Sequence, residues 1–468
     1  MASERDRVAT SIVLRYGSGQ LGAQIFRDTP AVLLPIFMTT MLGVPAWLSG
    51  IVILIPKLWV IVCDPLVGAW SDRMKPRRGR TPFLLVGAVL TSLCFVGLFA
   101  ITGYPGPGVA AASICLLFFV ASTAFSVYSV PYLAVAAELS EDPHERTRIL
   151  VYRMLFTIVG VLVGVGVAQP LVFAFGGGAR GWHAMSLILG VVCLVSMLVP
   201  ALGLARVRLL PGGEAPPRLL QQIGPVLANR PYMTLLATCF IQGIGQASGY
   251  TVIAFVFLYA LGAVWMILPF IIVMTTCSAL SQPMWLALSR RFGKVPCYYA
   301  ASFVWMAVTV SWFWMRPGGA ALLSVPGVGA LSEQHLLVLL RAVVIGFSNA
   351  GFLLLAMSLM TDTVDYQRRT YGVAHEGVFS GLFSAAEKLA FALGPLVAGF
   401  VLSLFGFVSS TGGAAAQSPS AVTGILLLYS FIPAGTQLLS LLVFSRFQLQ
   451  RADAPLDAAA IEARHAIP

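Results

Sequence analysis

The sequence predicts an all-α integral membrane protein whose twelve transmembrane helices form two six-helix halves. Hydrophobic residues make up 58% of the 468 residues. Charged residues make up 10%, whereas an average globular chain carries about 25%. Continuous apolar stretches of the roughly 20 residues needed to cross a bilayer recur from end to end. Their continuity excludes a β-barrel, whose strands alternate in hydrophobicity.

Twelve apolar stretches are long enough to be spans. We expect them at about residues 12–41, 46–72, 81–103, 108–138, 146–175, 181–206, 231–262, 264–290, 295–316, 333–364, 376–407 and 419–447. The longest polar connection follows the sixth span and contains Gly and Pro. It divides the chain into an N-terminal half, a cytoplasmic linker, a C-terminal half and a cytoplasmic tail, at residues 1–206, 207–230, 231–447 and 448–468.

Basic residues gather in alternate loops, as the positive-inside rule predicts. One side holds most of them, including the run 73–80, whereas the other side holds only Arg180 and Arg316. We therefore expect both termini in the cytoplasm. The net charge of +11 then reflects topology, and we expect no nucleic-acid partner. The lack of an Asn-x-Ser/Thr sequence favours a bacterial inner membrane over a glycosylated eukaryotic surface.

The two halves resemble each other at a fixed offset. The related positions are Asp64-Pro65 with Gln282-Pro283, Gln24 with Gln242, and Asp28 with Gln246. A duplicated six-span unit is typical of transporters that bind their substrate near the midplane, between the repeats.

Residues 57–80 carry the densest set of charges near a span. Lys57, Asp64, Gly68 and Asp72 follow one another at intervals of seven, four and four residues, so they lie along one helix face. A charged stripe on a membrane helix must face protein or water rather than lipid. The stripe therefore indicates a transport pathway.

The inner end of this stretch, Gly68-x-x-x-Asp72-Arg73-x-x-x-Arg77-Arg78, resembles the loop signature of the major facilitator superfamily. Gly68 permits close helix approach, and Asp72 can cap a neighbouring helix or pair with Arg, which would lock one access state. Alternatively, the arginines only determine topology. We assign gating to Gly68, Asp72, Arg73, Arg77, Arg78 and Glu138.

Further short motifs narrow the family. They are Tyr16-Gly17-x-Gly19, Trp59 with Asp64-Pro65, Pro131-Tyr132-Leu133-Ala134, Glu145-Arg146-Thr147-Arg148, Asp362-Thr363-Val364-Asp365-Tyr366 and Lys388-Leu389. As a set they resemble the glycoside–pentoside–hexuronide:cation symporters, the melibiose-permease-like branch of the superfamily. The resemblance covers essentially the whole chain. It implies alternating-access co-transport with a cation, usually Na⁺ or H⁺.

The resemblance also implies roles for single residues. Asp64 matches a cation-site aspartate, and Arg153 and Lys388 match central basic residues. Three family carboxylates are missing, because their positions hold Val60, Ser129 and, at the sugar-binding position, Gln24. These departures argue against a melibiose-type Na⁺ site and against galactoside specificity.

Membrane-embedded acids are candidates for coupling, because an acid that titrates can carry a proton. We assign coupling to Asp64, Asp28 and Glu387. The alternative is structural ion pairing with Arg27, Lys57, Arg153 and Lys388, without coupling.

Polar and aromatic side chains in the spans are candidates for substrate binding. Glutamine amides can hydrogen-bond a hydroxylated ligand, and tyrosines can stack on a ring or simply pack as core. Our candidates are Gln24, Tyr128, Tyr132, Arg153, Gln242, Gln246 and Lys388.

The sequence therefore predicts a secondary transporter, working as a monomer in the bilayer, for a glycoside or other small hydroxylated solute coupled to H⁺ or Na⁺. The alternative cargo is a lysophospholipid or another amphipathic anion. We expect no resident metal or cofactor. We also expect no enzymatic activity, because no HExxH or GxSxG motif is suitably placed.

Overall fold

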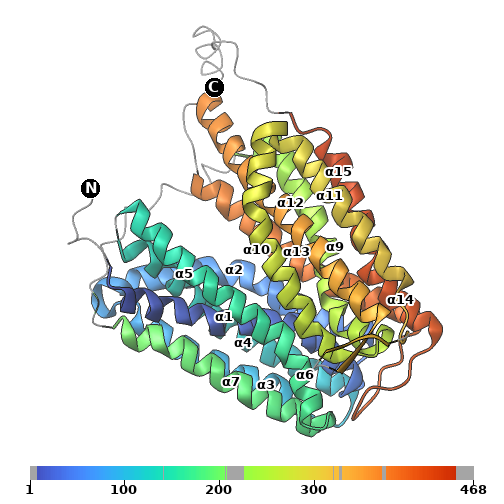
Figure 1. Cartoon of the computed structure of the whole chain (residues 1–468). Helices are drawn as coiled ribbons and strands as arrows, with labels where there is room; N and C mark the ends of the chain where they lie inside the picture. The colour runs from blue at the N-terminus through green and yellow to red at the C-terminus, as the bar shows by residue number, and fades with distance from the viewer. Residues whose placement is uncertain are drawn as a thin grey trace.

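The computed structural model describes residues 8–140, 142–205, 207, 226–319, 321–325, 329–371 and 376–448. The predicted linker lies largely outside the described residues, as does the predicted tail beyond residue 448. Each of the twelve predicted spans coincides with one helix or with a run of joined helical segments (Figure 1).

The N-terminal half consists of six helical passes. They are α1 (Thr10–Thr40), α2 (Ala46–Arg78), α3 (Thr81–Ala100), α4 (Pro107–Glu138), α5 (Pro143–Val161) continued by η2 (Leu162–Val167) and α6 (Ala168–Ala174), and α7 (Gly178–Gly203). The segment η2 is a π-helix with the sequence LVGVGV. Such bulges weaken regular helical bonding and are frequent at functional sites.

The C-terminal half repeats this plan. Its passes are α9 (Arg230–Phe255) with η3 (Val256–Ala260), η4 (Val264–Met266) with α10 (Ile267–Phe292), α11 (Lys294–Val310) with η5 (Ser311–Trp314), α12 (Glu333–Tyr371), α13 (Glu376–Leu404), and α14 (Pro419–Tyr429) with α15 (Phe431–Phe444). The last pass breaks at Ser430, three residues before Pro433, which cannot donate to the helix.

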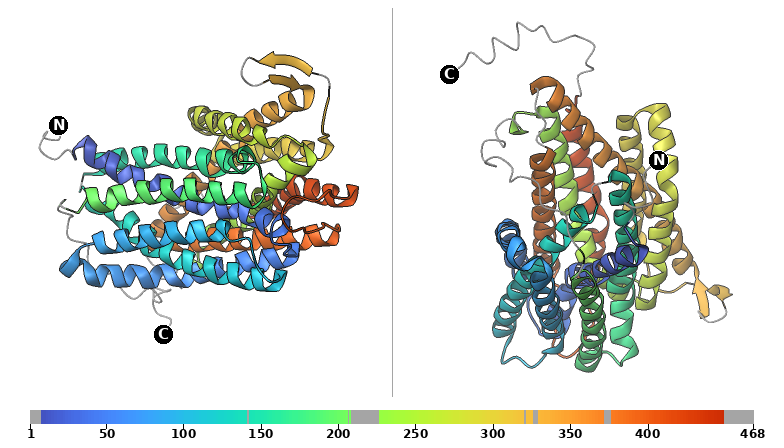
Figure 2. Two further views of the ribbon diagram at one scale, coloured as in Figure 1. Left: turned by 90° about the horizontal axis from the view of Figure 1, so that it is seen from below. Right: turned by 90° about the vertical axis from the view of Figure 1, so that its left-hand side faces the viewer.

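One element was not predicted. A short antiparallel hairpin of β1 (Ala321–Val325) and β2 (Gly329–Ser332) lies in the connection between α11 and α12. It stands outside the helical bundle, so the all-α membrane architecture is unaffected (Figure 2).

The exteriors of the helices are apolar, as expected for a protein surrounded by lipid. Ten helical stretches of the described chain are long and apolar enough to cross a membrane. The other two passes are α1, which carries Arg27 and Asp28, and α11, which has 17 residues. Leu93, Leu202 and Leu404 expose 62%, 63% and 82% of their surface. Such exposure is unfavourable in water and favourable in a bilayer.

The two halves meet at one end of the molecule and diverge toward the other (Figures 1 and 2). We call the end that holds the α1–α2 turn the outer end, and the end that holds the basic loops the inner end. Contacts between the halves run along α2 with α13, α1 with α9, and η2 with α10. The halves are thus in contact at the outer end and apart at the inner end.

The outer end is closed by backbone hydrogen bonds between the halves. The Ser410 amide donates to the Thr39 carbonyl at 2.8 Å, and the Gly43 amide donates to the Ser410 carbonyl at 2.9 Å. Leu42 and Thr411 form an antiparallel β-bridge between them. Gly43 has a φ of 65°, which side-chain-bearing residues rarely adopt. We call these residues, 39–43 and 409–413, the outer seal.

Behind the outer seal, α2 and α13 approach each other through glycines. A Cβ atom on Gly50 would lie 2.7 Å from the Pro395 carbonyl oxygen. A Cβ atom on Gly399 would clash with the Ala46 carbonyl. Small residues allow this close backbone approach between membrane helices.

The glycine contact yields a first prediction. Gly399→Val should prevent α2 and α13 from closing, at a cost of about 1–3 kcal/mol to the arrangement in which the outer end is closed. The measurement is disulfide formation between Leu42→Cys and Thr411→Cys in a variant that lacks the seven native cysteines. We expect its yield to fall about tenfold. Gly381→Val on the same helix is the matched control, since no atom lies within 4 Å of a Cβ there. Equal yields in both variants would contradict the prediction.

Candidate functional site

The central contact between the halves is an ion pair. The Lys388 ammonium on α13 donates to Asp64 Oδ2 on α2 at 2.6 Å. The side chains are 41% and 18% exposed, so the pair borders open space without lying in bulk solvent. Asp64 Oδ1 is buried and has no hydrogen-bond partner. The pair therefore retains an unused acceptor next to a partly accessible cation.

The ion pair belongs to an antiparallel series of contacts along α2 and α13. From the outer end inward, Ala46 meets Gly399 and Gly50 meets Pro395. One level further in, the Lys57 ammonium donates to the Phe391 carbonyl at 3.1 Å. The series ends at Asp64 and Lys388. The stripe predicted on residues 57–80 thus faces the opposite half at Lys57 and Asp64.

A second polar series runs along α1. Arg153 Nε on α5 donates to Gln20 Oε1 at 2.9 Å, and Gln20 donates to Gln24 Oε1 at 3.3 Å. Gln24 Nε2 then donates to Asp28 Oδ2 at 2.7 Å. The three α1 side chains are buried, whereas Arg153 is half-buried. The series therefore leads from an accessible guanidinium to an enclosed carboxylate.

Asp28 lies at the junction of the halves. Its carboxylate is 3.6 Å from Arg27 Nε, and the Tyr250 hydroxyl on α9 lies against it. The Arg27 side chain is 67% exposed, so this ion pair is peripheral. Asp28 thus contacts both halves, as Asp64 does, although it is more deeply buried.

The C-terminal half contributes amides on α9. Gln242 Oε1 accepts a hydrogen bond from the Tyr298 hydroxyl at 2.9 Å. Gln246, one turn further out, has a buried Nε2 with no hydrogen-bond partner. The repeat that related Gln246 to Asp28 thus places an unused donor in the second half.

Other predicted site residues are not brought to this cluster. Tyr128 and Tyr132 are fully buried and stack with Tyr16 between α1 and α4, with ring centroids 5.4 and 4.6 Å apart along the stack. The Tyr132 hydroxyl donates to the Tyr16 carbonyl at 2.8 Å. Both tyrosines belong to the buried core of the N-terminal half in this structure. Their contact with substrate stays a prediction. Glu387 is exposed on α13, and α13 directs Lys388 rather than Glu387 at Asp64.

A separate ionic network lies at the inner end of the N-terminal half. Arg80 Nη2 is 2.6 Å from Glu138 Oε1 and 2.8 Å from Asp72 Oδ1. Arg80 also donates to Ser71 Oγ at 2.7 Å, and Lys75 Nζ is 2.9 Å from Glu138. Burial alone would lower the pKa of the Arg80 guanidinium, but the hydrogen bonds to Glu138 and Asp72 raise it above its ordinary value.

This network includes two of the residues assigned to gating, Asp72 and Glu138. It is centred on Arg80, which was not among those candidates, and the gating role stays a prediction. Arg73 and Arg77 are exposed, and the side chain of Arg78 lies outside the described residues. A Cβ on Gly68 would meet only Val130 Cγ1 at an ordinary 3.5 Å, so the close helix approach expected there is absent from this state. The halves diverge at this end, which removes the neighbour that Gly68 would need.

The C-terminal half has a counterpart. Lys294, at the start of α11, is 2.7 Å from Asp362 on α12. Arg80 likewise precedes α3 and pairs with Glu138 on α4. In each half, an ion pair at the inner end therefore joins two neighbouring passes. The cation lies next to the start of the third pass, and the acid lies on the fourth pass.

Comparison with known proteins identifies the family. A family described as "MFS/sugar transport protein" matches residues 15–451. The chain belongs to this family. The predicted resemblance to cation symporters of the melibiose-permease-like branch is thereby confirmed.

The relatives of this sugar transport protein are transporters. The isoprimeverose transporter of Lactiplantibacillus pentosus is 23% identical, with 85% of this chain and 80% of the relative covered. The putative glycoside/cation symporter YagG of Escherichia coli strain K12 is also 23% identical, with 89% and 87% covered. Neither relative supports the predicted lysophospholipid alternative.

A solved structure shows the same fold. A bacterial homologue of the human lysosomal transporter Spinster has a TM-score of 0.67 at 12% identity, covering 95% of this chain and 97% of the other. The predicted fold of the major facilitator superfamily is confirmed.

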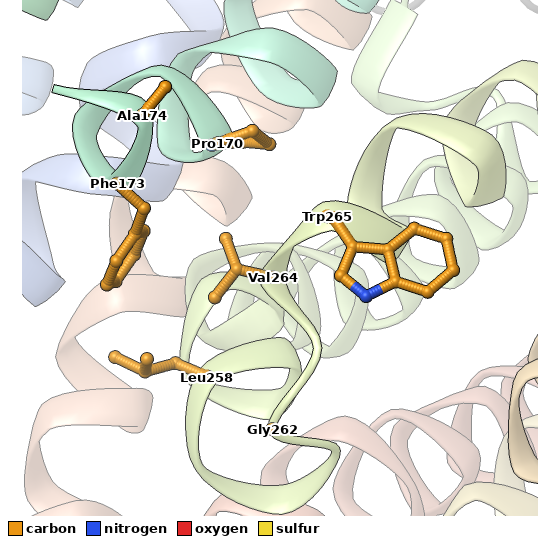
Figure 3. Close-up of a pocket in the computed structure, with 7 residues that line it drawn as sticks. All are labelled: Pro170, Phe173, Ala174, Leu258, Gly262, Val264 and Trp265. Atoms are coloured by element: carbon orange, nitrogen blue, oxygen red, sulfur yellow. The ribbon is translucent and has the colours of Figure 1, made fainter. Parts of the chain in front are cut away.

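The transporter also has an apolar cavity of about 460 Å³ at its outer end (Figure 3). It lies between the halves and is lined by Pro170, Phe173, Ala174, Leu258, Gly262, Val264 and Trp265. Its side chains are apolar apart from the indole N–H of Trp265, so the lining offers far fewer polar groups than the polar cluster does. No group of three or more His, Cys, Asp or Glu side chains that could hold a metal ion occurs among the described residues.

The inner network yields a second prediction. Arg80→Gln should destabilise the transporter by about 1.5–3 kcal/mol, because buried Glu138 loses its hydrogen bonds from the guanidinium and keeps only Lys75 as a charged partner. The measurement is thermal unfolding in detergent. Arg73→Gln is the matched control, since that exposed side chain should contribute less than about 0.5 kcal/mol. Arg80→Gln with an unchanged melting temperature would argue against the network.

Proposed function

We propose that this protein is a cation-coupled sugar symporter that works by alternating access. The observation that carries the proposal is the Asp64–Lys388 ion pair between the halves of a sugar-transporter fold. Any reorientation of the halves must rearrange this pair. A charge left unpaired inside a bilayer is costly, so the rearrangement requires another ion to compensate it.

We assign the coupling to a proton. Hard metal cations are held by several oxygen ligands. Lys388 occupies Asp64 Oδ2, and the two positions where the family resemblance implies further carboxylates hold Val60 and Ser129. Protonation of Asp64, in contrast, removes the charge that holds Lys388 and requires no further ligand. Lys388 is then free to donate to the substrate.

We place the sugar between Arg153 and the Asp64–Lys388 pair. The accessible guanidinium and ammonium groups supply donors, and Asp64 Oδ1 supplies an acceptor for a hydroxyl. The names of the relatives, an isoprimeverose transporter and a glycoside/cation symporter, support a sugar as cargo. Asp28 and Gln24 order Arg153 through Gln20.

The topology is also part of the proposal. We propose that both termini lie in the cytoplasm of a bacterial cell, which the basic residues of the inner loops support. We expect the monomer to be the transporting unit, because both halves of the site come from one chain.

Transport by proteoliposomes tests the proposal. We expect concentrative uptake of labelled isoprimeverose or another glycoside when an inward proton gradient is imposed. We expect no uptake of a labelled lysophospholipid. Uptake that follows a Na⁺ gradient while the proton gradient is collapsed would overturn the proton assignment and leave symport intact. Absence of any gradient-driven sugar uptake would overturn the function itself.

A third prediction concerns Asp64. Asp64→Asn should abolish accumulation above equilibrium, because the amide cannot take up a proton, yet sugar counterflow should remain. The comparison of the two assays separates coupling from binding. Asp64→Asn combined with Lys388→Gln removes both charges of the pair and serves as the charge-balanced control. Accumulation by Asp64→Asn equal to that of the wild type would contradict the assignment.

A fourth prediction concerns Arg153. Arg153→Gln should raise the KM for sugar about 10-fold to 100-fold, since it removes a hydrogen bond from a charged group, which contributes about 1.5–3 kcal/mol. The maximal rate should change less. Arg27→Gln is the matched control, because the Arg27 side chain is largely exposed. A similar KM for both variants would exclude Arg153 from the sugar site.

A further inference from the structure

Lys57 is a cation inside the membrane whose described hydrogen bond is to backbone rather than to an acid. Its ammonium donates to the carbonyl oxygen of Phe391, on the opposite half, at 3.1 Å. Asp28 and Arg27 lie within its electrostatic reach. A lysine in a span normally pairs with a carboxylate or with a carbonyl that lacks a donor.

The Phe391 carbonyl can accept this bond because of the residue four positions further along α13. In a regular helix, the amide of residue 395 would donate to the carbonyl of residue 391. Residue 395 is Pro395, which has no amide hydrogen and whose ring pushes that carbonyl out of line. The Phe391 carbonyl oxygen therefore lacks a helical donor. It lies at the contact between α2 and α13, where it can accept a hydrogen bond from the other half.

The same turn of α13 also receives Gly50 of α2, whose Cβ would lie 2.7 Å from the Pro395 carbonyl. Gly50 and Lys57 are seven residues apart and so lie on one face of α2. This face of α2 thus makes two contacts with the turn of α13 that contains Pro395. Gly50 packs closely against it, and Lys57 donates a hydrogen bond to it. Lys57 lies between this packed level and the Asp64–Lys388 pair.

We propose that Lys57 is a positioning residue that holds the transporter in its inward-open state by binding the carbonyl left free by Pro395. When α2 and α13 separate at the outer end, this bond must break. The lysine thus sets the ratio of the two access states without touching the sugar. The inference rests on the proposed alternating access.

Distances between spin labels test this inference without any substrate. Labels at Arg73→Cys on α2 and Gly381→Cys on α13 report how far the halves diverge at the inner end. Both positions are exposed. Double electron–electron resonance in lipid, in a variant without the native cysteines, gives the populations of long and short inner distances. Long distances correspond to the inward-open state.

We expect Lys57→Met to lower the ratio of long to short distances about 10-fold to 100-fold, the range for a hydrogen bond to a charged group. Lys57→Arg, which keeps a charged donor, should retain most of the long population. Pro395→Ala restores the helical amide and turns the carbonyl along the axis of α13, so it should shift the populations like Lys57→Met. The double variant should shift no further than the larger single effect.

Pro283→Ala is the matched control, because it removes a proline from α10 whose freed carbonyl is not contacted by Lys57. It should leave the populations unchanged. Unchanged distances in Lys57→Met or in Pro395→Ala would overturn the inference, as would full additivity in the double variant. Pro395→Ala keeps the test decisive if Lys57→Met fails to fold. If these distances shift as expected but no gradient drives sugar uptake, the proposed function fails and the inference about Lys57 stands.

Discussion

The low polarizability of a lipid bilayer is the constraint on which this structure depends, because every charge within it needs a partner. The chain satisfies this requirement largely across the seam between its halves. Asp64 on α2 pairs with Lys388 on α13, and Asp28 on α1 meets Tyr250 on α9. Pairing across the seam makes the position of one half conditional on the other. A change of charge at the seam, by protonation or by a bound sugar, therefore becomes a change in the relative stability of two arrangements.

Irregular backbone contributes to the same seam. Pro395 leaves the Phe391 carbonyl to Lys57. On the other side of the interface, Gln169 of α6 donates to the Ala254 carbonyl of α9 at 3.3 Å, next to the π-helical segment η3. In both places a donor from the N-terminal half reaches a carbonyl in or beside an irregular stretch of the C-terminal half. Irregular backbone is tolerated at membrane depth where protein satisfies it. At the seam, the opposite half satisfies the carbonyls of such stretches, and the resulting hydrogen bonds join the two halves.

Hydropathy and charge were sufficient to predict the fold, since span length and basic loops are local properties. The offset repeat also related Asp28 on α1 to Gln246 on α9, and these two helices contact each other across the seam. Partners were less predictable, because Asp64 and Lys388 are 324 residues apart and only packing brings them together. Arg80 looked like one of several loop arginines until burial distinguished it. The packing of Tyr128 and Tyr132 against α1 was not predicted, because it depends on the glycine at position 19, which leaves room for both rings.

The distribution of ion pairs determines how the molecule can move. At the inner end, Arg80 with Glu138 and Lys294 with Asp362 each join helices of one half, and the described pairs there do not cross the seam. Each half is therefore braced internally where it is most exposed. The described bonds between the halves include those of Lys57, Asp64 and Gln169 and those of the outer seal. Opening at the outer side thus requires these bonds to break while each half keeps its own packing, which is a rigid-body rotation.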